Sequence, residues 1–255
     1  MWTRSLLKTN AKQVLRQNYW TAFLVCLVAS LLSFGSGGFR LNFNLNYNTS
    51  TEYYNYQFNP FDVFGGNPLT SSIVRFLTVF ASVLTIIFLL LRIFVTNPIE
   101  VGRCRYFMES RIGDAPFSSL FSVFGSPGYW NIVKVMFLKN LFVFLWSLLL
   151  VFPGIYKSYQ YRMVEYLLAE NPYLPYDRAL DLSRMMTDGE KFNIFVLELS
   201  FFGWFFLGAM LCYIGMLFVY PYFYATFAEL YAAMRAKAFA CGMSDEEELS
   251  GFLQY

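Results

Sequence analysis

Long blocks of apolar residues alternate with short polar segments along the chain. The last block is much longer than the roughly 17–25 residues of one membrane span, so it is expected to contain two helices. A break near Gly208 to Gly215 would divide it, and Pro221 would kink the helix that follows. The pattern predicts an all-α fold, a polytopic transmembrane helix bundle with about six membrane helices and a range of about four to six. The apolar blocks are residues 19–34, 72–95, 132–152, 155–168 and 192–234.

Residues 155–168 decide the number of spans, because this apolar stretch is short and carries Arg162 and Glu165. If it lay outside the membrane, the basic residues after it would also fall outside, against the tendency of cytoplasmic loops to carry Lys and Arg. A return through the membrane, joined to the preceding helix by Pro153 and Gly154, is therefore favoured. A partly immersed helix remains the alternative.

The N-terminal segment, residues 1–18, combines basic and apolar positions at helical spacing. Arg4, Lys8, Lys12 and Arg16 recur every four residues, so they share one face of a helix. Like charges four residues apart cost about 0.2–0.5 kcal/mol per pair, whereas each basic residue near an anionic membrane surface gains about 1 kcal/mol. We expect an interfacial amphipathic helix that binds membrane lipids of the anionic leaflet. An ordinary basic flank of the first span is the alternative.

The segments outside the apolar blocks differ in character. Residues 40–70 are rich in Asn and Tyr, and we expect them to form an extracytoplasmic loop, either a hairpin or disordered. Residues 175–189 are expected to form an amphipathic cytoplasmic stretch, and residues 240–255 a cytoplasmic tail whose acidic run is solvated. The chain is thus predicted to be a single integral membrane domain over residues 1–255, multi-pass in the plasma membrane, with both termini cytoplasmic.

Composition separates the chain from soluble proteins. Hydrophobic residues make up 57% and charged residues 14%, against about 45–50% and about 25% in soluble globular domains. The 19 Lys and Arg and the 17 Asp and Glu are too evenly balanced for a nucleic-acid-binding protein. The sequence has no histidine, and it lacks a phosphate-binding Gly loop, a nucleophile elbow and a metal-binding motif. No enzyme activity, catalytic residue, metal or cofactor is therefore predicted.

Several ionisable residues are predicted to lie within the membrane. At 1.5 Å per helical residue they sit roughly 9–14 Å from the cytoplasmic helix ends, so their side chains could meet. Because isolated charges in a bilayer are costly, the arginine could neutralise one carboxylate while the others share a proton or hold a cation. The favoured interpretation is that the charges join neighbouring helices as structural contacts. The predicted charge cluster consists of Arg162, Glu165, Glu198 and Glu229.

A set of short motifs, taken in order along the chain, is similar to those of a bacterial family. The motifs are the basic N-terminal helix, Asn97-Pro98 to Phe107, Pro153-Gly154-Ile155, Ala179 to Ser183 with Met185, Met186 and Gly189, Leu199 to Trp204, and Pro221-Tyr222 to Tyr231. They resemble the family of uncharacterised polytopic integral membrane proteins, mostly from Firmicutes, known as domain of unknown function 975. The resemblance implies a polytopic plasma-membrane protein and no established activity.

Two functions remain open at this point. The favoured one is a non-catalytic membrane protein of the bacterial envelope that binds lipid or a protein partner, which includes a second copy of the chain. The alternative is a small transporter or permease that uses intramembrane carboxylates. Broken helices near the midplane are typical of transporters, and the break near Gly208 to Gly215 is a candidate for one.

Overall fold

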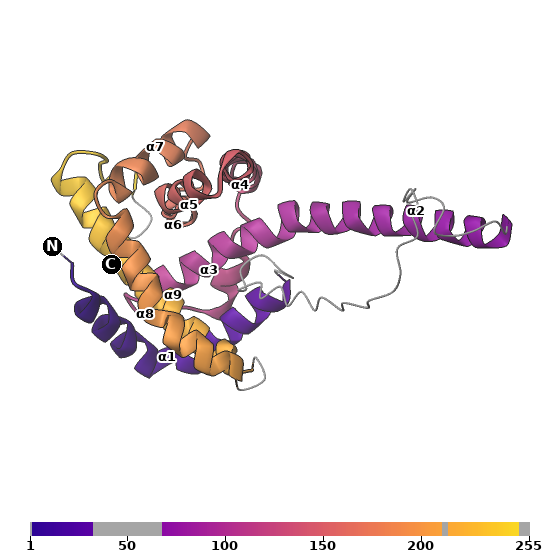
Figure 1. Ribbon diagram of the computed structural model, residues 1–255. Coiled ribbons are helices and arrows are strands. Elements are labelled where there is room, and N and C mark those ends of the chain that lie inside the picture. The colour runs from indigo at the N-terminus through magenta and orange to yellow at the C-terminus, as the bar shows by residue number, and fades with distance from the viewer. Residues whose placement is uncertain (1, 33–67, 211–213, 250–255) are drawn as a thin grey trace, which may run out of the picture.

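The computed structural model describes residues 2–32, 68–210 and 214–249, and these residues form helices without a strand. The prediction of an all-α fold is confirmed. Most helices pack into one body, from which one long helix projects (Figure 1). The elements are α1 (Arg4–Leu32), α2 (Pro68–Leu91), the π-helical turn η1 (Arg92–Thr96), α3 (Asn97–Glu109), the 3-10 turn η2 (Phe117–Phe121), α4 (Tyr129–Leu149), α5 (Val151–Gln160), α6 (Val164–Glu170), α7 (Tyr176–Thr187), α8 (Lys191–Met210) and α9 (Ile214–Ala240).

The first and the last helix pack together, with α1 lying along α9. α1 departs from helical geometry at Asn18 (φ −125°, ψ 30°). This kink falls at the predicted boundary between the basic N-terminal helix and the first apolar block. Leu7, Ala11 and Leu15 are buried on the inner face of α1, at the spacing expected for one face of a helix.

α8 and α9 form a pair of helices that approach closely at the end where the chain joins them. A Cβ atom on Gly208 would lie 2.8 Å from the backbone nitrogen of Met216, and one on Gly215 would lie 2.7 Å from the Cα of Gly208. The prediction that residues 192–234 hold two helices is confirmed. The glycines themselves do not break a helix: each lies within one and permits close packing, and α9 continues through Pro221.

α2 continues through η1 into α3, so that one helical run crosses from the surface to the centre of the body. α2 projects away from the other helices, and its apolar side chains from Phe76 onward are exposed (Figure 1). α3 is almost entirely buried, with Ile99, Tyr106 and Phe107 in the core. α3 is therefore a core helix, although it carries four charged residues, Glu100, Arg103, Arg105 and Glu109.

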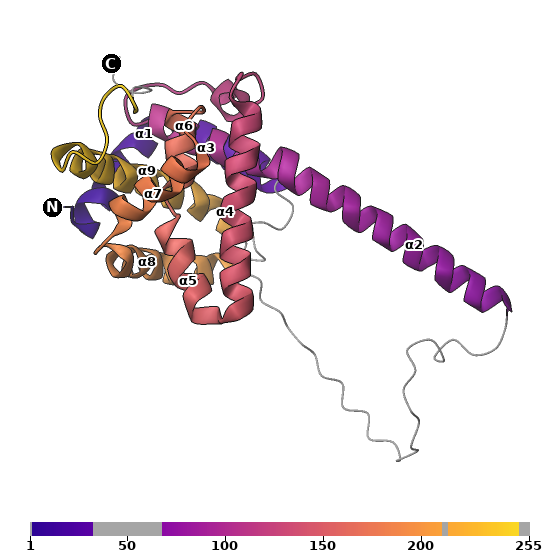
Figure 2. The same ribbon diagram turned by 90° about the horizontal axis from the view of Figure 1, so that it is seen from above.

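α4 and α5 form a hairpin, seen lengthwise in Figure 2. The chain turns at Leu150 (φ −158°, ψ 145°). The helices then meet tightly, since a Cβ on Gly154 would lie 2.1 Å from the hydroxyl oxygen of Ser147. The predicted return over residues 155–168 is divided between α5 and α6. α5 has 10 residues and reaches about 15 Å, half the thickness of a bilayer core, so it returns only part of the way.

Three helices are long and apolar enough to cross a membrane, judged by length and composition over the described residues. They are Phe76–Glu109, Tyr129–Leu149 and Lys191–Met210. In the most apolar 18-residue window of each helix most side chains are not buried, as expected for surfaces in contact with lipid rather than water. The chain therefore has the character of a polytopic membrane protein, and the figure of about six spans stays a prediction.

The C-terminal tail folds back on the body. Leu249 is fully buried, and the carboxylate of Glu248 binds the guanidinium of Arg178 on α7. The expectation of a fully solvated acidic tail holds for residues 245–247, which are exposed, and is wrong for Glu248. Residues 40–67 of the predicted Asn/Tyr-rich loop lie outside the described residues, and α2 begins at Pro68 within that prediction.

Candidate functional site

Two ion pairs join four elements at the centre of the body. Lys139 on α4 donates a hydrogen bond of 2.7 Å to Glu165 on α6. Arg162, in the turn between α5 and α6, lies 2.5 Å from Glu198 on α8. The hydroxyl of Tyr159 donates to the second oxygen of Glu198. The break between α5 and α6 explains this geometry, because it turns Arg162 toward α8 and Glu165 toward α4.

A pocket of about 300 Å³ lies beside these pairs. Its lining combines charged side chains of α3, α6, α8 and the turn before α6 with apolar and aromatic side chains of α8 and α9. The lining residues are Glu100, Arg103, Cys104, Arg162, Glu165, Tyr166, Glu198, Phe205, Met216, Tyr220, Phe223, Tyr224 and Phe227.

The two arginines of this pocket differ in their partners. Both stack on aromatic rings of α9: the Arg162 guanidinium carbon lies 4.8 Å from the Phe227 centroid, and that of Arg103 lies 3.9 Å from the Tyr224 centroid. Arg162 also has the carboxylate of Glu198. The Nε of Arg103 is buried and has no hydrogen-bond partner among the described residues.

Glu229 is not part of the central cluster. It lies on another face of α9, where Arg111 donates hydrogen bonds of 2.6 and 3.4 Å to its two oxygens. Asn10 of α1 donates a third, of 3.3 Å. The structure thus brings Arg162, Glu165 and Glu198 together and places Glu229 at a separate contact between α1, α9 and the chain end of α3.

Each carboxylate of the predicted charge cluster has a cation of its own: Lys139 for Glu165, Arg162 for Glu198 and Arg111 for Glu229. Opposite charges within hydrogen-bond distance compensate each other in the interior. Such pairs hold the helices in register, and the loss of one partner leaves a buried charge without compensation. The arrangement favours structural contacts over carboxylates that share a proton.

The basic N-terminal stripe, defined as Arg4, Lys8, Lys12 and Arg16, lies along α1 beside α8 and α9. Arg4, Lys12 and Arg16 are exposed and Lys8 is half-buried. The Lys8 ammonium lies 4.4 Å from the centroid of Phe201, and that of Lys12 lies 5.7 Å from the centroid of Tyr222.

An open hollow of about 670 Å³ lies between α1 and α9 at this stripe. Lys12, Arg16, Tyr19 and Tyr222 are among its lining residues. Basic side chains and tyrosines are the residues that gather at the headgroup level of a membrane. The residues around this hollow are thus of the kinds found at binding sites for anionic headgroups.

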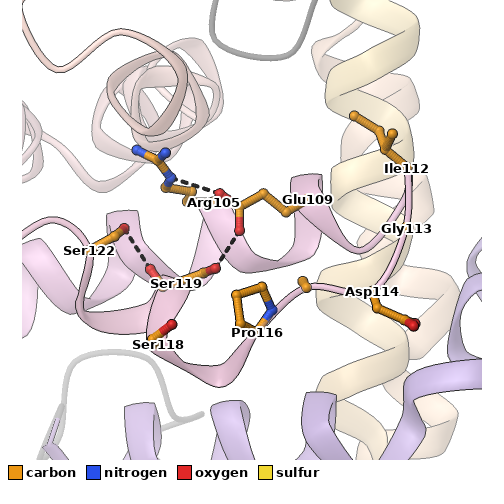
Figure 3. A pocket seen from close by; sticks show the side chains of 10 residues that line it. Arg105, Glu109, Ile112, Gly113, Asp114, Pro116, Ser118, Ser119 and Ser122 are labelled. Carbon is orange, nitrogen blue, oxygen red and sulfur yellow. Dashed lines mark hydrogen bonds and ion pairs between the residues drawn. The ribbon is translucent and has the colours of Figure 1, made fainter. Parts of the chain in front are cut away.

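A second open hollow, of about 570 Å³, lies where α3 ends and η2 begins (Figure 3). Its polar groups are already engaged. Arg105 donates a hydrogen bond of 2.9 Å to Glu109, and the hydroxyl of Ser119 donates to the other oxygen of the same carboxylate. Asp114 accepts a hydrogen bond of 2.8 Å from Asn18 on α1. In this hollow Arg105 and Glu109 thus compensate each other, while Asp114 is bound by a neutral amide.

The C-terminal tail is held by charge. Arg178 on α7 donates hydrogen bonds of 2.6 and 2.7 Å to the two oxygens of Glu248, and one of 2.7 Å to the carbonyl of Met243. The hydrogen bond from Arg178 is the main reason that the pKa of Glu248 is lowered. Glu248 therefore keeps its charge, and the tail its attachment, at neutral pH.

Sequence reasoning missed Lys139, Arg103 and Tyr159. Lys139 carries a signal that could have been used, because it is a charge within the apolar block 132–152, and intramembrane charges require partners. Arg103 gave no such signal, since the segment around it has the polarity of a loop. Among the described residues, no group of His, Cys, Asp or Glu is placed to hold a metal ion.

Comparison with known proteins gives one match. The family model described as "Protein of unknown function (DUF975)" matches residues 73–238. The chain belongs to this family, as its motifs predicted, although the basic N-terminal helix lies outside the matched residues. No curated protein and no solved structure matches the chain.

Proposed function

We propose that this member of the DUF975 family is a non-catalytic integral membrane protein of the bacterial plasma membrane that binds anionic lipids at the basic N-terminal stripe. The observation that carries the proposal is the hollow between α1 and α9. It combines Lys12 and Arg16 with Tyr19 and Tyr222. Each cation near an anionic membrane surface contributes about 1 kcal/mol of attraction, and tyrosine rings favour the headgroup region.

The stripe also indicates how the protein lies in the membrane. The inner face of α1 is occupied by contacts with the body through Leu7, Ala11 and Leu15, so its basic face is left for the lipid surface. Basic residues favour the cytoplasmic side, and the N-terminus is therefore placed there. The C-terminal tail follows two basic residues, Arg235 and Lys237. We therefore assign the tail to the same side.

The pairing of the buried carboxylates supports a binding function over transport. A transporter that moves protons or cations needs a carboxylate that gains and loses its charge partner during the cycle. Glu165 and Glu198 each have a cation within 2.7 Å. In proteoliposomes we expect no ion or solute flux under an imposed gradient, and a flux that disappears in Glu198→Gln would restore the transport hypothesis.

Lipid selectivity in proteoliposomes tests the proposal. Spin-labelled phosphatidylglycerol and phosphatidylcholine are compared for their association with the full-length protein. We expect a preference for phosphatidylglycerol that weakens with added salt. The double variant Lys12→Gln, Arg16→Gln should lose most of it.

The matched control removes two exposed cations elsewhere, Lys134→Gln and Arg184→Gln. If the control lowers the preference as much as the stripe variant does, binding depends on net charge alone and the proposed seat is wrong. If wild type shows no preference for the anionic lipid, the proposed function itself fails.

A further inference from the structure

Arg103 is a buried cation whose Nε has no hydrogen-bond partner among the described residues. Its side chain reaches the pocket from the middle of α3, and the residue is 8% exposed. A guanidinium carries five N–H donors, and the Nε of Arg103 is fully enclosed. Its close contact is the face of Tyr224. Burying a charge without hydrogen bonds is costly, so such a group points to a missing ligand.

Two carboxylates of the same pocket, Glu165 and Glu198, are already engaged by other cations. Glu165 is held by Lys139 and also accepts from the Cys104 thiol at 3.8 Å, while Glu198 is held by Arg162 and Tyr159. Both carboxylates line the same pocket as Arg103 and are engaged elsewhere. The buried guanidinium of Arg103 is therefore left without a hydrogen bond to these two carboxylates, which leaves room for a further acceptor.

The rest of the pocket is apolar and aromatic. Besides its charged residues it is lined by Phe205 of α8 and by Met216, Tyr220 and Phe223 of α9. The same two helices expose further large apolar side chains, Phe206 and Phe218 among them. The pocket thus combines charged groups with apolar side chains of helices whose outer surface suits lipid acyl chains.

We propose that this pocket binds the head of a single-chain amphiphile that carries one negative charge, with the oxyanion on Arg103 and the first part of the chain between Phe205 and Met216. The volume of about 300 Å³ is at the low end for small-molecule sites, so it accepts a headgroup and a few methylene groups, and the remaining chain lies in the membrane. Because Arg162 is already paired with Glu198, a single negative charge on Arg103 fits better than two.

The test is titration of the full-length protein in phosphatidylcholine nanodiscs with dodecanoate, read by native mass spectrometry and by the shift of the thermal unfolding midpoint. Dodecanol has the same chain without the charge, and acetate has the charge without the chain. Lysophosphatidylglycerol carries a single charge on a phosphodiester and distinguishes a lipid headgroup from a free carboxylate. We expect one bound dodecanoate or lysophosphatidylglycerol per chain, and no binding of dodecanol or acetate.

The variants separate binding from folding. Arg103→Gln should weaken binding about 10- to 100-fold, the usual effect of losing charge-assisted hydrogen bonds. Met216→Trp should block the apolar part of the pocket while Arg103 stays in place. The control Arg105→Gln, two residues along the same helix and paired with Glu109 outside this pocket, should bind as wild type does.

The results that overturn the proposal are specific. If dodecanol binds as well as dodecanoate, the negative charge is irrelevant to binding. If acetate binds as well as dodecanoate, the alkyl chain is irrelevant. Unchanged affinity in Arg103→Gln, or a lowered unfolding midpoint in that variant without any ligand effect in wild type, would make Arg103 a packing residue on Tyr224. These outcomes concern Arg103 and leave the lipid seat at Lys12 and Arg16 to its own test.

Discussion

Replacement of Lys139 by methionine should destabilise the protein strongly. Lys139 and Glu165 lie 2.7 Å apart with side-chain exposures of 10% and 22%, so solvent screens the pair only weakly. Removing one partner of a buried ion pair costs about 3–5 kcal/mol, because the other charge stays buried without compensation. We expect the lower half of that range, since Arg162 is also close enough to Glu165 to stabilise its charge.

The assay is reversible unfolding of the purified protein in mixed micelles, for Lys139→Met, Glu165→Leu and the double variant. Each single change should be costly, whereas the double change should lie within about 1 kcal/mol of wild type, because an apolar pair replaces an ionic one. The control Arg105→Gln breaks a more exposed pair with Glu109 and should cost only about 0.2–1 kcal/mol. If Lys139→Met costs no more than the control, or if the double variant is as unstable as the sum of the single ones, the reasoning is refuted.

Two further predictions concern packing and pH. Gly208→Ala should destabilise the protein by about 1–3 kcal/mol, because its Cβ would lie 2.8 Å from a backbone atom of Met216. Gly203→Ala on the same helix, whose Cβ would have no neighbour within 4 Å, should stabilise it by about 0.5–1 kcal/mol. Both are measured by unfolding, and equal effects of the two variants would contradict the close approach of α8 and α9. The contact with Arg178 lowers the pKa of Glu248. It therefore stabilises the folded tail fully above the usual carboxyl pKa of about 4.3, and this stabilisation is lost as the pH falls through the lowered pKa. Hydrogen-exchange protection of residues 243–249 should decrease over that acidic range, and protection that does not depend on pH would contradict the contact.

The helices were predictable because their signals are local. The apolar blocks gave α4, α8 and α9 nearly to their ends, and the kink at Asn18 falls where the basic pattern of α1 gives way to the apolar one. The division of residues 155–168 was not predictable, because the break depends on tertiary contacts. Ser183 on α7 donates a hydrogen bond to the carbonyl of Gln160 and accepts one from the backbone of Met163, and these contacts end α5.

The candidate site was predictable only in part. Counting residues from the cytoplasmic helix ends placed Arg162, Glu165 and Glu198 at a similar depth in the membrane. In the structure these three residues lie together. Depth carries no information about the direction of a side chain around a helix, which is why Glu229 was grouped with them and instead contacts Arg111. The environment of Arg103 depends on α3 entering the core, and no local pattern indicates that.

The central claim, that the protein binds anionic lipid at the basic N-terminal stripe and not through its buried carboxylates, is tested most directly by native mass spectrometry of protein released from nanodiscs that contain phosphatidylglycerol. Wild type and Glu198→Gln are predicted to retain the anionic lipid, whereas Lys12→Gln, Arg16→Gln is predicted to lose it. Retention that survives in the stripe variant and disappears in Glu198→Gln would contradict the account and assign the binding to the buried carboxylates.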